Sequence, residues 1–546
     1  MTAAREPRIR PSALSDRRLE LLAYLGILIV AAVLRLGSNL AARGSWDADQ
    51  GHDMLVLRAL VLDGRIPLLG PPTSIGDFHH GMVYYLLLAP AAALSHADPI
   101  AVTTWIALGG IAAVAVTGWL ARSIAGPIAG LLAALLLAVS SSAIEESIFI
   151  WNPNLIALSS SIALAAAWHA WRSRRARWWL LAGLAAVVTM QCHVLGVILT
   201  PVIGGLLVAD VRRRRRAGDR SGADAVGRAA LGWLAIAILS YVPLAIHEIG
   251  SDASELRAAI AFLAGGGPAS IALAARIPIV GLRVLGWPLT DLITVAPVAT
   301  VLASALVVGL AIWRGWVARD ERESGVVRGS GRPNPDDERT GVRWLALGLA
   351  WTIIALAVGA SSLATVVAGL PNDHYHAFAD PIVVVLVAVG VAALVKSRSS
   401  RGAPAPSVVG IVVLVALIVW NLANQPPTVA ADGGWAAARL AADRVVRAGE
   451  GRPIALASLP TFKSDEALRM PLAADGVELL PAGIDSAAFD GADATRVVLC
   501  DQLFRDSIGA DCGGPAEDAW IGPAATTKLK DRFEAAPGRW ISIYRP

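Results

Sequence analysis

The sequence contains little charge for a chain of its length. Only 16% of its 546 residues are charged and 55% are hydrophobic, and the mean hydropathy is +0.58. These values exclude an ordinary soluble globular enzyme. The formal net charge of +4 says little alone, because the basic residues are clustered in short runs. Those runs lack interleaved aromatic residues, which disfavours a nucleic-acid partner.

Cysteine is also scarce, with three residues in the whole chain. Cys192 falls in an apolar segment, where we expect it to be buried and inert. Cys500 and Cys512 lie near each other in a polar tail, and we predict a disulfide between them if that tail is outside the cytoplasm. Two unpaired thiols are the alternative.

The first apolar segment lacks the features of a signal peptide. Residues 19–42 form a long run that carries Arg35 and has no small-residue cleavage site. We therefore expect it to be the first of many membrane spans, each needing about twenty apolar residues. We find no internal repeats.

Clusters of arginine set the orientation of the spans, because Lys and Arg in short loops stay in the cytoplasm. The clusters assigned to that side are 5–18, 172–175, 212–216, 319–343 and 396–401. The predicted spans are 19–42, 100–121, 124–142, 153–171, 178–192, 194–210, 229–248, 292–313, 344–367, 380–396 and 407–424. About eleven spans is an odd count, so the tail is expected outside.

This topology divides the chain into parts. Residues 1–18 are predicted to be a cytoplasmic tail, and residues 19–424 a membrane domain whose first outer loop covers 43–80. Within that domain the polar segment 318–343 is predicted to be a disordered cytoplasmic loop. Residues 425–546 are predicted to form an extracytoplasmic domain.

Two segments need a separate interpretation. The apolar stretch 82–94 is short, and counting it as a span would reverse the orientation, so we expect an interfacial or re-entrant helix. In the tail, a helical pattern at 435–448 accompanies β-like runs at 454–456, 496–499 and 540–544. The tail is long enough for a small α/β domain.

The first outer loop opens on Trp46-Asp47-Ala48-Asp49-Gln50-Gly51-His52-Asp53. It places three carboxylates and a histidine within seven positions, directly after a span. Ionisable groups at membrane depth are costly and indicate a functional site. A partly desolvated carboxylate there can take a proton from an attacking hydroxyl, and nearby basic groups can bind a phosphate.

More polar residues gather on the same predicted side. Candidate contacts for substrate or donor phosphate are His52, Arg58, His79, His80, Tyr84, His374, Tyr375 and His376. The second outer loop adds Glu145, Glu146, Asn152 and Asn154. Structural alternatives stay open: solvated loop carboxylates, an interfacial His-His anchor, an aromatic belt at positions 84–85 and a helix cap at 374–376. Spacing alone shows too few ligands to assign a metal.

These motifs resemble membrane glycosyltransferases of the GT-C fold, above all the family of protein O-mannosyltransferases and lipid A aminoarabinose transferases. The stretch 46–50 is similar to that family's first-loop Asp-Glu pattern. Phe78-His79-His80-Gly81-Met82-Val83-Tyr84-Tyr85-Leu86 resembles its Pro-Pro-Leu-Tyr-Tyr entry to a juxtamembrane helix. His374-Tyr375 followed by Asp380-Pro381 resembles its late Arg/His-Tyr element. The likeness in layout covers residues 19–424, and the tail matches only in placement.

The resemblance implies inverting transfer of a sugar from a polyprenyl-phosphate donor, with a first-loop aspartate as base. Asp49 matches that position best and Asp47 is second. His52 lies near the position where members of the family carry a basic contact to the donor phosphate. His79 or His80 lies where other members have a lysine. Gln50 replaces the family's glutamate, and the second-loop acid is displaced, so a divalent metal requirement is left open and no cofactor is assigned.

We therefore expect an α-helical polytopic membrane protein of GT-C type with a small α/β domain, in the cytoplasmic membrane of a prokaryote. It would move a hexose or pentose from the lipid-linked donor to a lipid, glycan or protein acceptor outside the cytoplasm. One rival is a transporter or flippase of lipid-linked saccharides, which favours charged or broken helices at mid-membrane. The other is a non-catalytic envelope assembly protein.

Overall fold

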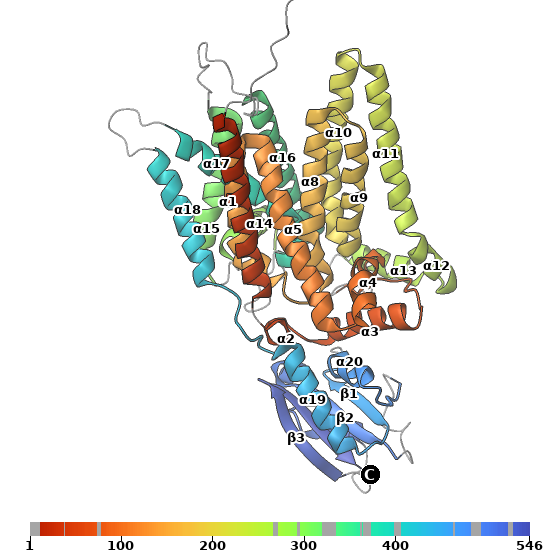
Figure 1. The fold of residues 1–546 in the computed structure, drawn as a ribbon. Coiled ribbons are helices and arrows are strands. Elements are labelled where there is room, and N and C mark those ends of the chain that lie inside the picture. Colours follow the sequence, from red (N-terminus) through yellow and green to blue (C-terminus); the bar gives the residue numbers. More distant parts are fainter. Residues whose placement is uncertain are drawn as a thin grey trace, which may run out of the picture.

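The computed structural model describes residues 11–37, 39–73, 78–265, 271–291, 295–318, 335–360, 363, 373–397, 406–461, 465–481, 493–521 and 528–545. In it, a tall bundle of helices stands on a small domain that contains the sheet (Figure 1). Most of the predicted loop 318–343 and the first ten residues of the predicted tail 1–18 lie outside the described residues.

Within the described ranges, nine helical segments are long and apolar enough to cross a membrane. They comprise α1 (Pro11–Leu36), α5 (Pro99–Ala125), η2 (Val194–Ile198) with α10 (Leu199–Arg216), α11 (Arg220–Ser240) with α12 (Val242–Gly250), α14 (Leu273–Thr290), α15 (Pro297–Ile312) with η3 (Trp313–Val317), α16 (Pro335–Gly359), η5 (Asp373–Ala379) with α17 (Asp380–Lys396), and α18 (Pro406–Ala423). The chain is an integral membrane protein.

Three more predicted spans form helices that are shorter or less apolar. These are α6 (Pro127–Val139), α8 (Ile156–Ser173) and α9 (Arg177–Cys192), and all three are packed inside the bundle. Every predicted span thus coincides with a described helix, and the predicted α-helical polytopic class is confirmed.

Helix α14 is an apolar helix that the predicted topology does not include. It follows α13 (Ser254–Gly265), which contacts the first loop. Its last turn accepts hydrogen bonds from Ser140 at the end of α6 and from Asn421 at the end of α18. The end of α14 therefore lies beside the ends of α6 and α18.

Local sequence explains where several of these helices begin and end. The side chain of Asp98 accepts from the Ile100 amide at 3.2 Å and Pro99 occupies the first helical position, so α5 begins there. Gly126, with φ of 90°, separates α5 from α6, which also begins with a proline. Such breaks divide the apolar sequence into separate spans.

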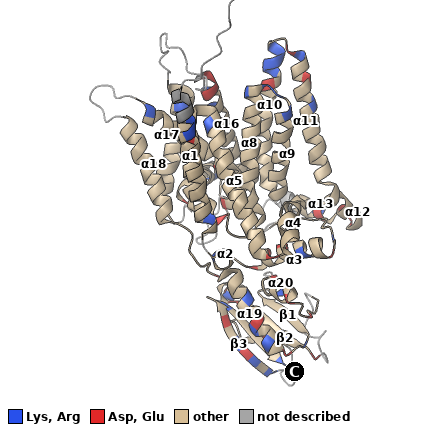
Figure 2. Cartoon of the chain, viewed as in Figure 1, with Lys and Arg blue, Asp and Glu red and all other residues tan. Residues whose placement is uncertain are grey.

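Basic residues mark one end of the bundle. Figure 2 shows Lys and Arg at the end away from the sheet domain, including the connection between α10 and α11. The arginine run 212–216 forms the last turns of α10. The sheet domain carries charges of both signs (Figure 2).

The chain between α1 and α5, which includes the predicted first loop, contains three helices. They are α2 (Leu40–Arg43), α3 (Ala48–Leu62) and α4 (Val83–Ser95), and they lie between the bundle and the sheet domain (Figure 1). Helix α4 corresponds to the predicted interfacial segment and has 13 residues, too few to cross a bilayer core unaided. The second outer loop forms α7 (Ser141–Glu145) and η1 (Asn152–Leu155).

The tail forms a small α/β domain around a four-stranded sheet of order β1-β2-β4-β3. Its elements are α19 (Gly434–Gly449), β1 (Ile454–Leu459), α20 (Glu466–Ala474), β2 (Thr495–Asp501), η7 (Gln502–Phe504), α21 (Arg505–Ile508), α22 (Pro515–Ile521), β3 (Lys528–Ala536) and β4 (Arg539–Arg545). Strands β1 and β2 are parallel, and the other neighbours are antiparallel. Cys500 and Cys512 are joined by a disulfide.

Candidate active site at the junction of the membrane and sheet domains

The predicted catalytic carboxylates lie at the start of α3. Asp47 is the N-cap residue, and its amide donates to the side chain of Gln50 at 2.8 Å. Asp49 lies in the first helical turn and is exposed. The partial positive charge of a helix N-terminus favours a carboxylate at this position. Glutamine at position 50, where the resembling family has an acid, therefore serves as part of a helix cap.

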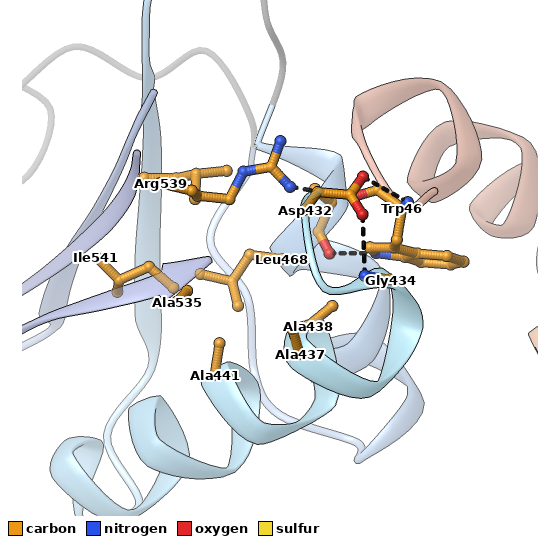
Figure 3. Close-up of a pocket in the computed structure, with 12 residues that line it drawn as sticks. Trp46, Asp432, Gly434, Ala437, Ala438, Ala441, Leu468, Ala535, Arg539 and Ile541 are labelled. Carbon is orange, nitrogen blue, oxygen red and sulfur yellow. Dashed lines mark hydrogen bonds between the residues drawn. The ribbon is translucent and has the colours of Figure 1, made fainter. Parts of the chain in front are cut away.

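Asp47 is held by an arginine from the end of the chain. Arg539 of β4 donates to Asp47 at 2.9 Å, to the Trp46 carbonyl at 3.0 Å and to Asp501 of β2 at 3.0 Å. Asp432 accepts from the Trp46 amide at 2.7 Å. Figure 3 shows Trp46, Asp432 and Arg539 together at one end of a pocket between first loop and sheet domain. Asp47 thus links the two domains.

His52 lies one helical turn after Asp49 and is also bound by the sheet domain. Its Nδ1 is 2.9 Å from Glu466 of α20. The hydrogen bond and negative charge of Glu466 raise the pKa of His52 above its ordinary value, and the charges of Asp53 and Asp49 act in the same direction. The imidazole therefore favours its cationic form more strongly than an isolated histidine.

Asp53, the third first-loop carboxylate, is buried. It accepts hydrogen bonds from the hydroxyls of Tyr84 at 2.8 Å and Tyr85 at 2.9 Å. Burial raises the pKa of Asp53 to about 7, although both tyrosines and the His52 charge oppose the rise. The geometry makes Asp53 a link between α3 and α4, and it places Tyr84, a candidate substrate contact, entirely inside the protein.

The remaining first-loop candidates have separate surroundings. His79 is held by Glu255 of α13, which accepts from its amide at 2.6 Å and lies 3.0 Å from its Nδ1. Arg58 is half-exposed two turns beyond His52 on α3. His80 is buried, and burial lowers its pKa to about 4, so this imidazole is neutral at physiological pH.

A group of packed rings, partly or fully buried, connects the first loop to the late motif. The ring centroids of His80 and His193 are 4.7 Å apart, as are those of His193 and Tyr375. The ring centroid of His374 lies 3.9 Å from that of Trp151, with the rings tilted, and 4.0 Å from that of Tyr375, edge to face. His80 and the adjacent pair His374 and Tyr375, which lie far apart in the sequence, are thus brought together, and His193 is a member of the group that the sequence did not indicate.

The third histidine of the late motif belongs to a buried ion-pair network. His376 Nε2 lies 3.1 Å from Asp373. Asp373 accepts from Arg283 of α14 through two hydrogen bonds of 2.8 and 2.9 Å. This network joins α14 to η5 and fixes the entry to α17.

The second outer loop combines two structural amides with two acids. Asn152 donates to the Cys192 carbonyl at 2.6 Å, and Asn154 donates to the Phe149 carbonyl at 2.8 Å. Glu145 is exposed at the end of α7, whereas Glu146, the next residue, is buried.

Glu146 is the most deeply placed acid of this loop. Burial, followed by the charge of Asp380, raises its pKa strongly. Among the residues that the structure describes, no group of three or more His, Cys, Asp or Glu side chains is arranged to hold a metal ion.

Comparison with known proteins gives matches only at the level of structure. No protein-family model matches the sequence, and a search of curated proteins finds no relative. ArnT from Cupriavidus metallidurans in the apo state has a TM-score of 0.53 at 12% identity, covering 97% of this chain and 98% of ArnT. Its complex with undecaprenyl phosphate has a TM-score of 0.52 at 11% identity, with the same coverage.

A second solved structure is similar to this chain. The archaeal oligosaccharyltransferase AglB from Archaeoglobus fulgidus, in complex with an inhibitory peptide and a dolichol-phosphate, has a TM-score of 0.50 at 12% identity. The match covers 90% of this chain and 70% of AglB. ArnT and AglB are GT-C proteins, and the likeness confirms at the level of the fold what the first-loop and late motifs predicted.

Proposed function

We propose that this chain, which has the GT-C fold of membrane glycosyltransferases, transfers a sugar from a polyprenyl-phosphate donor to an acceptor of the cell envelope. The observation that carries the proposal is the position of Asp49. It is an exposed carboxylate at the N-terminus of α3, where the membrane bundle meets the sheet domain.

The proposed reaction is a single displacement with inversion. An acceptor hydroxyl attacks the anomeric carbon, the bond from that carbon to the phosphate oxygen breaks, and polyprenyl phosphate leaves. The hydroxyl proton passes to the carboxylate of Asp49, which acts as general base. Cationic side chains near the phosphate stabilise the charge that it gains in leaving.

Asp49 suits the role of base better than its neighbours. Asp47 forms an ion pair with Arg539 and caps the helix, so its carboxylate has a structural role. Asp53 is buried beneath two tyrosine hydroxyls. Only Asp49 of these three carboxylates is exposed, so an acceptor can approach it.

The proposed donor is a sugar on polyprenyl phosphate. Two similar structures hold the lipid-phosphate part of such a donor, undecaprenyl phosphate in ArnT and dolichol-phosphate in AglB. His52, Arg58 and His79 are the proposed phosphate contacts. His80, which is buried and neutral, is better suited to packing than to binding an anion. The sugar is proposed to be a hexose or pentose, and the acceptor a lipid, glycan or protein.

The site is proposed to face the outside of the cytoplasmic membrane. The arginine runs lie at the opposite end of the bundle from the sheet domain (Figure 2), and positive loops stay inside. A disulfide in the sheet domain suits an oxidising compartment. Residues 43–80 and the tail would then both be extracytoplasmic.

The test of this function is donor cleavage by the purified protein. In detergent, with a radiolabelled sugar on polyprenyl phosphate and an envelope extract as acceptor source, we expect release of polyprenyl phosphate with appearance of a labelled product. A transporter or an assembly protein would bind the donor and leave it intact. Intact donor after prolonged incubation with active extract would contradict the proposal.

A further inference from the structure

The backbone of α20 in the sheet domain is in direct contact with the backbone of α3 in the first loop. A Cβ atom added to Gly51 of α3 would lie 2.2 Å from the carbonyl oxygen of Glu466 in α20. The indole of Trp46 donates to the carbonyl of the next residue, Ala467, at 2.8 Å. Glycine at position 51 therefore permits an approach that no other residue allows, and Glu466 lies directly over the first turns of α3.

This approach places a carboxylate from the tail beside the proposed donor site. Glu466 Oε1 is 2.9 Å from His52 Nδ1, although 414 residues separate them in the chain. The bond makes Nδ1 the ring nitrogen that donates, and it leaves Nε2 as the second nitrogen of a half-exposed ring. A carboxylate bound to one nitrogen of an imidazole fixes the orientation of the ring and favours its cationic form, in which the other nitrogen also donates.

We propose that Glu466 is a positioning residue of the active site, which holds His52 as a cation whose Nε2–H faces the phosphate of the lipid-linked donor. The inference rests on the proposed function and deepens it, since it makes the sheet domain part of the donor site. The charged groups that act on His52 are Glu466 from α20 and Asp49 and Asp53 from its own helix. All three are carboxylates and favour the cation.

The experiment follows phosphate binding against pH in the full-length protein. The probe is a short-chain polyprenyl phosphate, titrated in detergent into wild type and Glu466→Gln, which keeps the shape of the side chain and loses its charge. In wild type we expect affinity to fall about tenfold as pH rises through the pKa of His52. In Glu466→Gln that fall should occur about one pH unit lower, because one opposite charge has been removed.

Two further variants and a control separate positioning from packing. In His52→Gln the pH-dependent fall should disappear, and adding Glu466→Gln to it should change affinity by less than twofold. Glu534→Gln, an exposed glutamate of β3 that accepts from the Gly538 amide, should behave as wild type.

The failures of the two proposals are distinguishable. A Glu466→Gln variant that binds with the wild-type pH dependence would overturn the positioning role and leave the proposed function intact. Absence of polyprenyl phosphate binding by wild type at every pH would overturn both.

Discussion

Arg539 and Asp47 form an ion pair with a distance of 2.9 Å between two residues that lie 492 positions apart in the chain. The pair joins the last strand of the sheet domain to the cap of the helix that carries Asp49. The same guanidinium also bonds to Asp501 and to the Trp46 carbonyl. The start of α3 is therefore shaped partly by the tail.

Removing this arginine should loosen the start of α3. In Arg539→Ala, Asp47 and Asp501 lose a partly buried partner, and charge-assisted hydrogen bonds are worth about 2 kcal/mol. We expect amide hydrogen exchange in the first turn of α3 to accelerate about 30-fold, the equivalent of that free energy.

The matched control for Arg539→Ala is Arg444→Ala. Arg444 pairs with Asp531 at 2.6 Å but is 44% exposed, within the sheet domain, and exposed pairs contribute less than about 1 kcal/mol. If amide hydrogen exchange in α3 is unchanged in Arg539→Ala, or accelerates equally in both variants, the role of the Arg539–Asp47 pair in holding the start of α3 is contradicted.

Changing both tyrosines that bind Asp53 to phenylalanine should lower the stability of the protein by an amount that depends on pH. The pKa of Asp53 is raised to about 7, so its contribution to stability falls as pH rises from about 4 through 7. Without the hydroxyls the pKa rises further and the fall continues to higher pH. Each added unit widens the gap to wild type by about 1.4 kcal/mol.

Thermal unfolding in detergent at pH 5 and pH 8.5 measures this effect. We expect the difference between wild type and Tyr84→Phe/Tyr85→Phe to be larger at pH 8.5. Tyr241→Phe, at the half-exposed end of α11, should show a difference independent of pH. A gap that is the same at both pH values would show that Asp53 does not titrate in this range.

Breaking the buried pair of Arg283 and Asp373 should be costly. Asp373→Ala leaves the guanidinium buried without its carboxylate, at a cost of about 3–5 kcal/mol. We expect poor recovery of monodisperse protein and a lower unfolding temperature. Asp252→Ala, which removes a fully exposed partner of Arg257, should leave both unchanged. A normal unfolding temperature for Asp373→Ala would contradict the buried network.

The disulfide offers a test of sidedness. Cells quenched in acid, then denatured and alkylated without reduction, should yield protein labelled only at Cys192. Reduction before alkylation should label all three cysteines. Three labels without reduction would place the tail in a reducing compartment.

Replacing Cys500 and Cys512 by serine should destabilise the sheet domain by about 3 kcal/mol, since the bond closes a loop of 12 residues.

The sequence allowed the spans to be predicted because length, apolarity and arginine runs are local properties. Helix α14 was missed since it is the least apolar of the nine long helices and contains Pro278, Pro288 and two arginines. In the tail, β1, β2 and β4 were predicted from short β-like runs at 454–456, 496–499 and 540–544. Strand β3 was missed because charged, exposed residues interrupt its pattern.

The composition of the site was only half predictable. Asp49, His52 and the late His-Tyr motif stand out because polar residues are unusual beside apolar spans. Their partners do not, since Glu255 and Glu466 lie 176 and 414 residues from the histidines that they bind. A local pattern carries no information on such pairing, and His193 is a lone histidine after an apolar helix.

The identity of the base is tested most directly by the initial rate of donor cleavage in Asp49→Asn, compared with Asp47→Asn at saturating donor. We expect the asparagine at position 49 to lower kcat at least a hundredfold, as for loss of a general base, while binding of polyprenyl phosphate stays within twofold of wild type. Asp47→Asn should keep a substantial part of the activity. Near-normal turnover by Asp49→Asn would contradict the proposed chemistry.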